Sequence, residues 1–360
     1  MLFKKNKNYV SEEQVSIIDG MRFYNKLARP ILGADAVLRI LQNEFQVQVK
    51  EESVRSLESY EDFNFVFTSI NNIDKSRNGK FVFKLHNSFD SMESTLLEAQ
   101  KKLLDHVQSV CVPMQLFPNK SIDVDGVLHT VRILTFVDGV MLSDVVDKSL
   151  KLFYNIGYTF GLLDLDLKSF DHHGMHRHLI WDIKNTLDTV ATFRSSIHDS
   201  NSNSLIEKGI NLFESIVLTR VKKLRTQVIH SDGNDHNIVV REDDSIGIID
   251  FGDANESWLV GEIAIAMAYV IITTEDLQCK LSNAKQVLLG YLEAVPLNED
   301  EMECIFPLIV GRIMVSVTVS AKSSEKFPQN SEYFLVHAKP AWAALEFLLK
   351  DIELHKVFVF

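Results

Sequence analysis

The chain has 360 residues, of which 46% are hydrophobic and 24% charged, a balance typical of a globular protein of one or two domains. Its net charge of -12 at pH 7 argues against nucleic acid as the main partner, because binding a phosphate backbone needs a basic face. The three cysteines lie far apart and form no CxxC pair, which is typical of a reducing compartment and gives no zinc pattern.

Neither export nor membrane insertion is indicated by the apolar patterning. Residues 1–14 are charged and lack the apolar core of a secretory signal. The longest apolar run, residues 259–272, is interrupted by Glu262 and is too short to span a bilayer. We therefore expect a cytoplasmic protein with no membrane partner.

The first part of the chain is predicted to be mostly antiparallel sheet. Residues 1–30 are polar and are expected to form an N-terminal arm. Residues 33–45 carry Val37, Leu38, Leu41 and Phe45 on one helical face. Strand-like apolar runs follow at 45–54, 63–70, 80–87, 111–117 and 128–136.

One further helix is expected among these strands, at residues 91–107. Met92, Leu96, Leu103 and Val107 recur there at helical spacing. The polar, Asn-rich segment between the runs at 63–70 and 80–87 is typical of a hairpin loop.

The pattern changes after Gly139. Helical periods dominate at 142–170, 178–193, 202–224 and from 262 to the end, and two short apolar β runs interrupt them at 237–240 and 246–250. The coarse architecture is α+β with two lobes. We assign residues 31–137 to a small β-rich N-lobe and residues 138–360 to a larger, mainly helical C-lobe.

Three polar residues surround the two short β runs. Asp232 lies five residues before Asn237, which lies thirteen before Asp250. If the runs form a hairpin, Asn237 and Asp250 are neighbours, and an amide oxygen beside a carboxylate suits Mg²⁺. Asp232, on the loop just ahead, can accept the proton of an attacking hydroxyl. Phosphoryl transfer needs groups that position the attacking hydroxyl, bind the metal ion and neutralise the charge that develops on the transferred group.

On these residues alone, a structural role and a zinc site both stay open. Asn, Asp and Gly commonly satisfy turns without a catalytic role. A zinc hydrolase would use His230, Asp232 and His236, or the pair His172 and His176. That pair falls in a glycine-containing loop, whereas zinc commonly binds a histidine pair on a helix.

The motifs "IHSDGNDHN" and "IIDFGD" resemble the aminoglycoside phosphotransferase and choline-kinase-like branch of the protein-kinase-like fold. Within that branch, "GDANESWLVGEIAIAMAY" and several upstream segments look most like the hydroxylysine kinases. The resemblance covers roughly residues 30–355. It implies a two-lobed kinase fold, with the nucleotide-binding sheet in the N-lobe and the catalytic and metal-binding loops in the C-lobe.

The resemblance also implies roles for single residues. Asp232 is expected to be the catalytic base, and Asn237 and Asp250 to be Mg²⁺ ligands. Lys84 is expected to pair with the α and β phosphates of the nucleotide, with Glu98 on the following helix as its partner. A lysine on an otherwise apolar strand needs such a partner for its charge.

Two further sites of nucleotide contact follow from the same resemblance. The turn that covers the phosphates has no glycine here, and its candidate residues are Ser59, Tyr60 and Asp62. The backbone from Leu134 to Val137 is expected to contact the base. The donor is GTP or ATP, and the family implies GTP.

Candidates for acceptor contact are Asp253, Arg177, Trp181 and Asp182. The chain departs from the family at Ser231, where glycine is usual.

The expected activity is transfer of a γ-phosphoryl group to the hydroxyl of 5-hydroxy-L-lysine, a small-molecule amino alcohol. Other acceptors remain open: choline, ethanolamine, homoserine or an aminoglycoside. A nucleotide-binding pseudoenzyme is the alternative from another class. The presence of Lys84, Asp232, Asn237 and Asp250 together argues against it.

Overall fold

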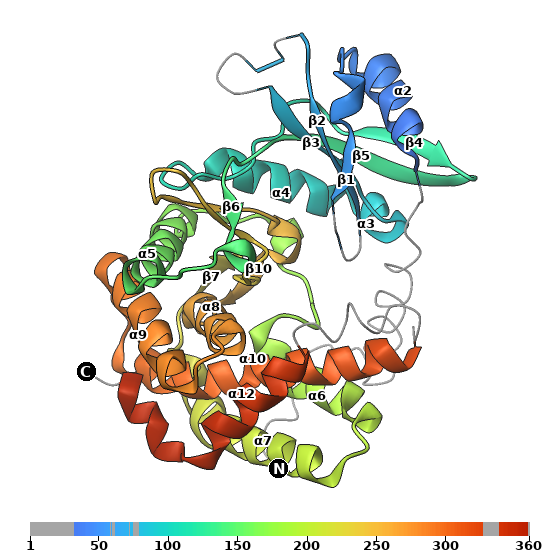
Figure 1. The fold of residues 1–360 in the computed structure, drawn as a ribbon. Helices are drawn as coiled ribbons and strands as arrows, with labels where there is room; N and C mark the ends of the chain where they lie inside the picture. Colours follow the sequence, from blue (N-terminus) through green and yellow to red (C-terminus); the bar gives the residue numbers. More distant parts are fainter. Residues whose placement is uncertain are drawn as a thin grey trace. The chain divides into compact units, whose positions relative to one another are not determined.

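The computed structural model describes residues 32–57, 59, 62–71, 73–74, 79–326 and 338–358. The chain divides into two compact units, drawn as ribbons in Figure 1. One comprises Met1–Glu98 with Pro113–Phe136, and the other Ala99–Val112 with Val137–Phe360. The expected N-terminal arm at residues 1–30 lies outside the described residues.

The first unit is built on a five-stranded antiparallel sheet in the order β1-β2-β3-β5-β4. Its strands are β1 (Arg55–Leu57), β2 (Phe63–Thr68), β3 (Lys80–Leu85), β4 (Lys120–Val124) and β5 (Val127–Thr135). The register sets Lys84 of β3 opposite Asn64 on one side and Arg132 on the other. The expected hairpin of β2 and β3 is confirmed.

One face of this sheet is covered by α2 (Ala34–Phe45) (Figure 1). Val37, Leu41 and Phe45, on the apolar face predicted for this helix, pack with Phe67 and Phe83 of the sheet. Full burial of each such side chain contributes roughly 1.5–3 kcal/mol. This core fixes β3, and with it the position of Lys84.

The prediction of a strand at 45–54 is wrong. The segment contains only an isolated bridge at Val49 and a 3-10 turn, Glu51–Ser53, and the strand β1 starts beyond it. The Ser53 hydroxyl donates to Lys50 O at 2.5 Å and accepts from Thr68 N at 2.8 Å. These side-chain hydrogen bonds replace a regular ladder.

The helix expected at 91–107 is two helices. The short α3 (Ser88–Met92) ends before α4 (Ser94–His106) begins. Because the interruption changes the helical phase, Met92 is 75% exposed rather than buried. The part of α4 in the second unit is held to α5 (Leu150–Leu167) by His106, whose Nε2 lies 3.0 Å from Asp166 O.

The second unit is mainly helical. Besides α5 its helices are α6 (Thr186–Phe193), α7 (Ser200–Arg220), α8 (Leu259–Thr273), α9 (Leu277–Ala294), α10 (Glu299–Lys326) and α12 (Ala338–Lys350). Helix α10 packs against α6, α7, α8 and α12. Within the described residues, α10 alone is long and apolar enough to cross a bilayer, and 89% of its most apolar stretch is buried, as in a core helix.

Short strands position the loops of this unit. β7 (Thr226–Ile229) pairs with β10 (Asn255–Trp258), and β8 (Ile238–Val240) pairs with β6 (Val140–Met141) and β9 (Ile246–Ile248). The hairpin of β8 and β9 confirms the prediction from the two short β runs. Ile249 N donates to Asn237 O at 3.0 Å, so the residues flanking the hairpin are neighbours.

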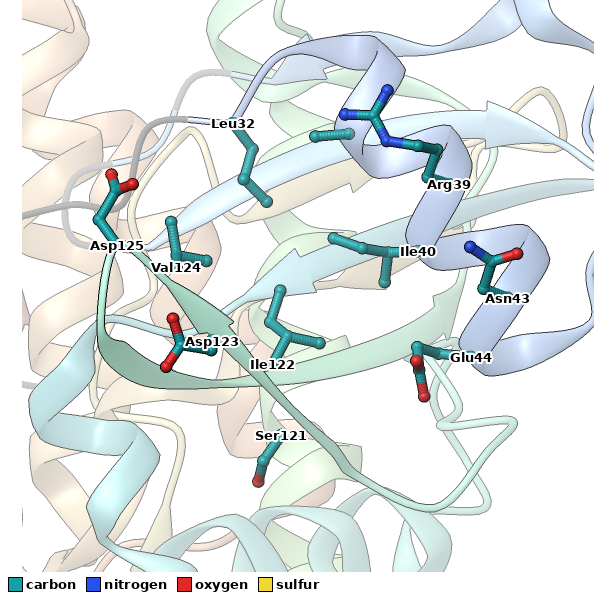
Figure 2. A pocket seen from close by; sticks show the side chains of 11 residues that line it. Leu32, Arg39, Ile40, Asn43, Glu44, Ser121, Ile122, Asp123, Val124 and Asp125 are labelled. Atoms are coloured by element: carbon teal, nitrogen blue, oxygen red, sulfur yellow. The ribbon is translucent and has the colours of Figure 1, made fainter.

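A groove lies beside α2 and β4 in the first unit (Figure 2). Its volume is about 570 Å³, and Arg39, Glu44, Asp123 and Asp125 are among its charged lining residues. None of the residues expected to contact the nucleotide lines it, so it lends no support to the expected nucleotide site.

Candidate active site

The candidate catalytic loop, residues 230–237, runs from β7 to β8 and is anchored by His230. This side chain is fully buried, its Nε2 donates to Ile249 O at 2.9 Å, and its Nδ1 accepts from Asp232 N at 3.2 Å. Its backbone N donates to the buried carboxylate of Glu262 on α8. The loop is therefore fixed from two sides.

Ser231 adopts a left-handed backbone with φ of 68°. Glycine enters this region without steric cost, whereas a Cβ is unfavourable there. The buried Ser231 hydroxyl donates to Asn255 Oδ1 at 2.7 Å. This hydrogen bond explains how serine is held at a position where the resemblance leads us to expect glycine.

Three side chains donate hydrogen bonds to the carboxylate of Asp232. Arg312 Nη2 lies 2.9 Å from Oδ1, and Asn234 Nδ2 and Asn237 Nδ2 lie 2.8 and 2.7 Å from Oδ2. Burial raises the pKa of Asp232 to about 6; the charge of Arg312 opposes this rise and that of Asp253 adds to it. A carboxylate with a pKa slightly below neutral is mostly ionised at pH 7 and can accept a proton from a hydroxyl.

Asn237 and Asp250 offer oxygen atoms that fit a hard divalent cation. The amide nitrogen of Asn237 is used by Asp232, which leaves its oxygen as a ligand. Asp250 is exposed at the end of the β8–β9 hairpin in a left-handed conformation, and its Oδ1 accepts from Gly252 N at 3.2 Å. An amide oxygen and a carboxylate are ligands of the kind that Mg²⁺ takes.

Arg312 is the site residue that no sequence motif indicated. It lies on α10, 2% exposed, with its guanidinium carbon 5.0 Å from the ring centre of Trp181 and 5.4 Å from that of Tyr269. Nη1 donates to Trp181 O at 2.8 Å, and Nη2 lies 3.2 Å from Tyr269 Oη. Trp181 is half-buried against this arginine and thus adjoins Asp232.

The other candidates for acceptor contact are placed differently. Arg177 donates to the backbone oxygens of Gly252 and Ala254, the second at 2.9 Å, and so supports the segment after Asp250. Asp182 is buried and accepts from Ser257 Oγ at 2.5 Å and Lys184 N at 3.0 Å. Asp253 is half-buried in the 3-10 turn Phe251–Asp253, and its negative charge raises the pKa of Asp232.

In the first unit, Asp62 lies against Lys84. Lys84 Nζ is 3.1 Å from Asp62 Oδ2, and His86 Nδ1 is 3.3 Å from the same oxygen. Asn87 donates to Oδ1 from its backbone N at 3.0 Å and from its side chain at 3.1 Å. Burial alone would raise the pKa of Asp62, but the charges of His86 and Lys84 hold it well below its ordinary value.

The remaining nucleotide candidates can be placed in part. Ser59 Oγ donates to Asp62 O at 2.5 Å. Glu98 is exposed on α4, and Leu134 is buried on β5. Val137 is buried at the start of the second segment of the other unit. Tyr60 lies outside the described residues.

The histidines of the zinc alternative do not converge. Within the described residues, the one group of three possible His, Cys, Asp or Glu ligands is Asp62, His86 and Asp90. His172 instead accepts from Gly174 N at 3.1 Å, and His176 pairs with Asp171 at 2.6 Å. His230 supports the backbone of the catalytic loop, so the zinc hydrolase finds no support.

The fold and the site define a class: an α+β, kinase-like enzyme that transfers phosphoryl groups to alcohols. A profile described as the phosphotransferase enzyme family matches residues 72–291. The chain belongs to this phosphotransferase enzyme family, and it is a small-molecule kinase.

Two curated relatives are similar over nearly the whole chain. A hydroxylysine kinase of Xenopus laevis is 28% identical over 346 residues, 89% of this chain and 90% of the relative. A hydroxylysine kinase of Mus musculus is 28% identical over 344 residues, with the same shares.

Solved structures share the fold at lower identity. A microcompartment-associated aminopropanol kinase gives a TM-score of 0.63 at 16% identity, over 87% of this chain and 98% of its own. An amicoumacin kinase in complex with AMP-PNP, Ca²⁺ and Ami gives 0.62 at 15% identity, over 84% of this chain and 92% of its own. The predicted kinase-like two-lobed fold class is confirmed.

Proposed function

We propose that this kinase transfers the γ-phosphoryl group of GTP, with Mg²⁺, to the hydroxyl of 5-hydroxy-L-lysine. The observation that carries the reaction class is the Asp232 carboxylate, held by Arg312, Asn234 and Asn237 next to two possible metal ligands. Support for the acceptor comes from the relatives named hydroxylysine kinase, which match over most of both chains.

The proposed mechanism gives each of these residues one task. Lys84, now paired with Asp62, would bind the nucleotide phosphates. Asn237 and Asp250 would hold Mg²⁺, which when bound neutralises charge that develops on the transferred group. Asp232 would accept the proton of the acceptor hydroxyl as its oxygen attacks phosphorus.

The charges around Asp232 suit an acceptor that carries ammonium groups. The negative charges of Asp250 and Asp253 both raise the pKa of Asp232, so three carboxylates lie close together in the second unit. A cation placed among them gains favourable Coulomb energy. Choline, ethanolamine, homoserine and aminoglycosides meet part of this requirement and remain the alternative acceptors.

The similar folds were solved with two different kinds of nucleotide. One of the similar folds, an aminoglycoside 2'-phosphotransferase-IIIa, was solved as a GDP complex, at a TM-score of 0.59 and 18% identity. The amicoumacin kinase instead holds AMP-PNP, an ATP analogue. GTP is therefore proposed from the resemblance to hydroxylysine kinases, with ATP as the alternative.

The test is a nucleotide-consumption assay with Mg²⁺. GTP and ATP are each combined with 5-hydroxylysine, choline, ethanolamine and homoserine, and L-lysine serves as the matched acceptor that lacks the hydroxyl. GTP consumption with hydroxylysine and not with lysine supports the proposal. Consumption with another acceptor alone overturns the substrate, and consumption that is the same with and without acceptors overturns the kinase assignment.

We also propose that the protein acts in the cytoplasm, without nucleic acid or membrane partners. The observations in favour are its acidic net charge and the free state of Cys111, Cys279 and Cys304. Fractionation of cells that express the tagged chain tests this; recovery in the membrane pellet after a salt wash would contradict it.

A further inference from the structure

The guanidinium of Arg312 is held within the second unit by two aromatic rings and by hydrogen bonds from both Nη atoms. It stacks between the rings of Trp181 and Tyr269, at 5.0 and 5.4 Å, within the range of about 6 Å over which cation–π attraction acts. Nη1 donates to Trp181 O at 2.8 Å, which fixes the plane of the guanidinium group. A buried cation this constrained has one orientation toward Asp232.

The hydrogen bonds to Asp232 leave a single acceptor position. A carboxylate has about four lone-pair sites on its two oxygens. Oδ2 receives two donors, from Asn234 and Asn237, and Oδ1 receives one, from Arg312. The remaining lone pair lies on Oδ1, and the side chain is 20% exposed.

We propose that Arg312 is the positioning residue for the catalytic base: it fixes Oδ1 of Asp232 so that its one open lone pair receives the proton of the acceptor hydroxyl. Asn234 and Asn237 cannot do this alone, because both bind Oδ2 and leave the carboxylate free to tilt.

Arginine is needed for its shape as well as its charge. Its planar fork reaches Trp181 O with one nitrogen and Asp232 with the other, whereas a lysine ammonium is a point charge on a flexible stem. The pair is also charge-assisted and almost excluded from water, which strengthens its hydrogen bond.

This inference rests on the proposed function, and its test begins with kinetics. Arg312→Met should lower kcat by roughly 10²-fold, the loss that a misplacement of about 1 Å produces. KM for the nucleotide should stay unchanged, because the residues proposed to bind it lie elsewhere in the chain. Arg312→Lys should fall between the parent and the methionine variant.

Rescue and a matched control separate positioning from folding. Methylguanidinium in the buffer should restore part of kcat to Arg312→Ala and none to Asp232→Asn. Lys280→Met removes another buried cation, one bonded to the backbone oxygens of Ile271 and Thr274, and should cost stability without lowering kcat. If Arg312→Met does not fold, Arg312→Lys and the rescue of the alanine variant decide.

A folded Arg312 variant with the kcat of the parent overturns the inference. A double-mutant cycle of Arg312→Met and Asp232→Asn, read by denaturant unfolding, needs no substrate. Fold-changes in the unfolding equilibrium constant that simply multiply in the double variant overturn the pairing, and a departure from that product supports it. If the parent turns over no acceptor, the proposed function fails while the cycle still decides the pairing.

Discussion

The hydroxyl of Ser231 donates a hydrogen bond to Asn255 Oδ1 at 2.7 Å, and it does so from a left-handed backbone at φ 68°. The catalytic loop is thereby tied to β10 at the residue before Asp232. Because both side chains are buried, the hydrogen bond cannot be replaced by bulk water.

Ser231→Ala should destabilise the protein by about 1–3 kcal/mol, since it leaves Asn255 Oδ1 without its donor while keeping the unfavourable Cβ. Ser231→Gly loses the same donor but recovers roughly 1–2 kcal/mol of left-handed strain. We therefore expect stability in the order parent, glycine, alanine, measured by denaturant unfolding. An alanine variant as stable as the glycine variant would show that a Cβ in the left-handed backbone at position 231 does not destabilise the protein.

Lys84→Met should raise KM for the nucleotide at least tenfold, because a phosphate loses its charged partner. The matched control is Lys80→Met on the same strand β3, where the side chain is exposed at the first residue. Both variants are compared in nucleotide titrations at saturating acceptor. Equal nucleotide KM values for the two variants would remove Lys84 from the nucleotide site.

Arg177→Met should raise the Mg²⁺ concentration needed for half-maximal activity by roughly 10–100-fold. The reason is that Arg177 supports the backbone oxygens of Gly252 and Ala254, just after the proposed ligand Asp250. A Mg²⁺ titration at saturating nucleotide measures the effect. Arg194→Met, which removes a partly exposed ion pair with Glu207, should leave the titration unchanged; a shift of equal size there would point to a general loss of structure.

Asp164 makes stability depend on pH. Burial raises its pKa well above 3.8, reinforced by the charge of Glu262, although Tyr291 Oη donates to it at 2.6 Å. A raised folded-state pKa gives stability that is present below the unfolded pKa and is lost as pH rises through the folded pKa. Asp164→Asn should therefore become progressively more stable than the parent as pH rises above 3.8.

That difference is read from unfolding free energies over a pH series. The substitution keeps an oxygen to accept the tyrosine hydroxyl, so packing changes little. A constant gap between parent and Asn variant at all pH values would mean that Asp164 titrates as it does in the unfolded chain.

The elements predicted correctly are those in which buried apolar residues recur at a regular spacing along the sequence. The face of α2 and the β8–β9 hairpin are of this kind, and so is the convergence of Asn237 with the residues after β9. The edge strand β4 was missed, because it is polar and mostly exposed. Its signal was Asp125-Gly126, a turn pair with positive φ at both residues that favours a tight hairpin.

The pairing of Arg312 with Asp232 could not be predicted from the residues that neighbour either of them in the sequence. Arg312 lies 80 residues from Asp232 and sits inside a long apolar helix, where a single arginine gives no motif. Its one signal was physical: an arginine buried among apolar residues needs an acidic partner. The pairing of Lys84 with Asp62 was likewise hidden, because it depends on the fold of the turn before β2.

If Asp232 is the base that accepts the hydroxyl proton in phosphorylation of 5-hydroxylysine, the reaction needs its carboxylate. The most direct measurement is the rate of phosphohydroxylysine formation from GTP, followed by mass spectrometry, for the parent and Asp232→Asn, with nucleotide binding measured on both. We expect the Asp232→Asn variant to lose roughly 10²–10⁴-fold in rate while it still binds the nucleotide. Phosphohydroxylysine formed by the variant at the parent rate would contradict it.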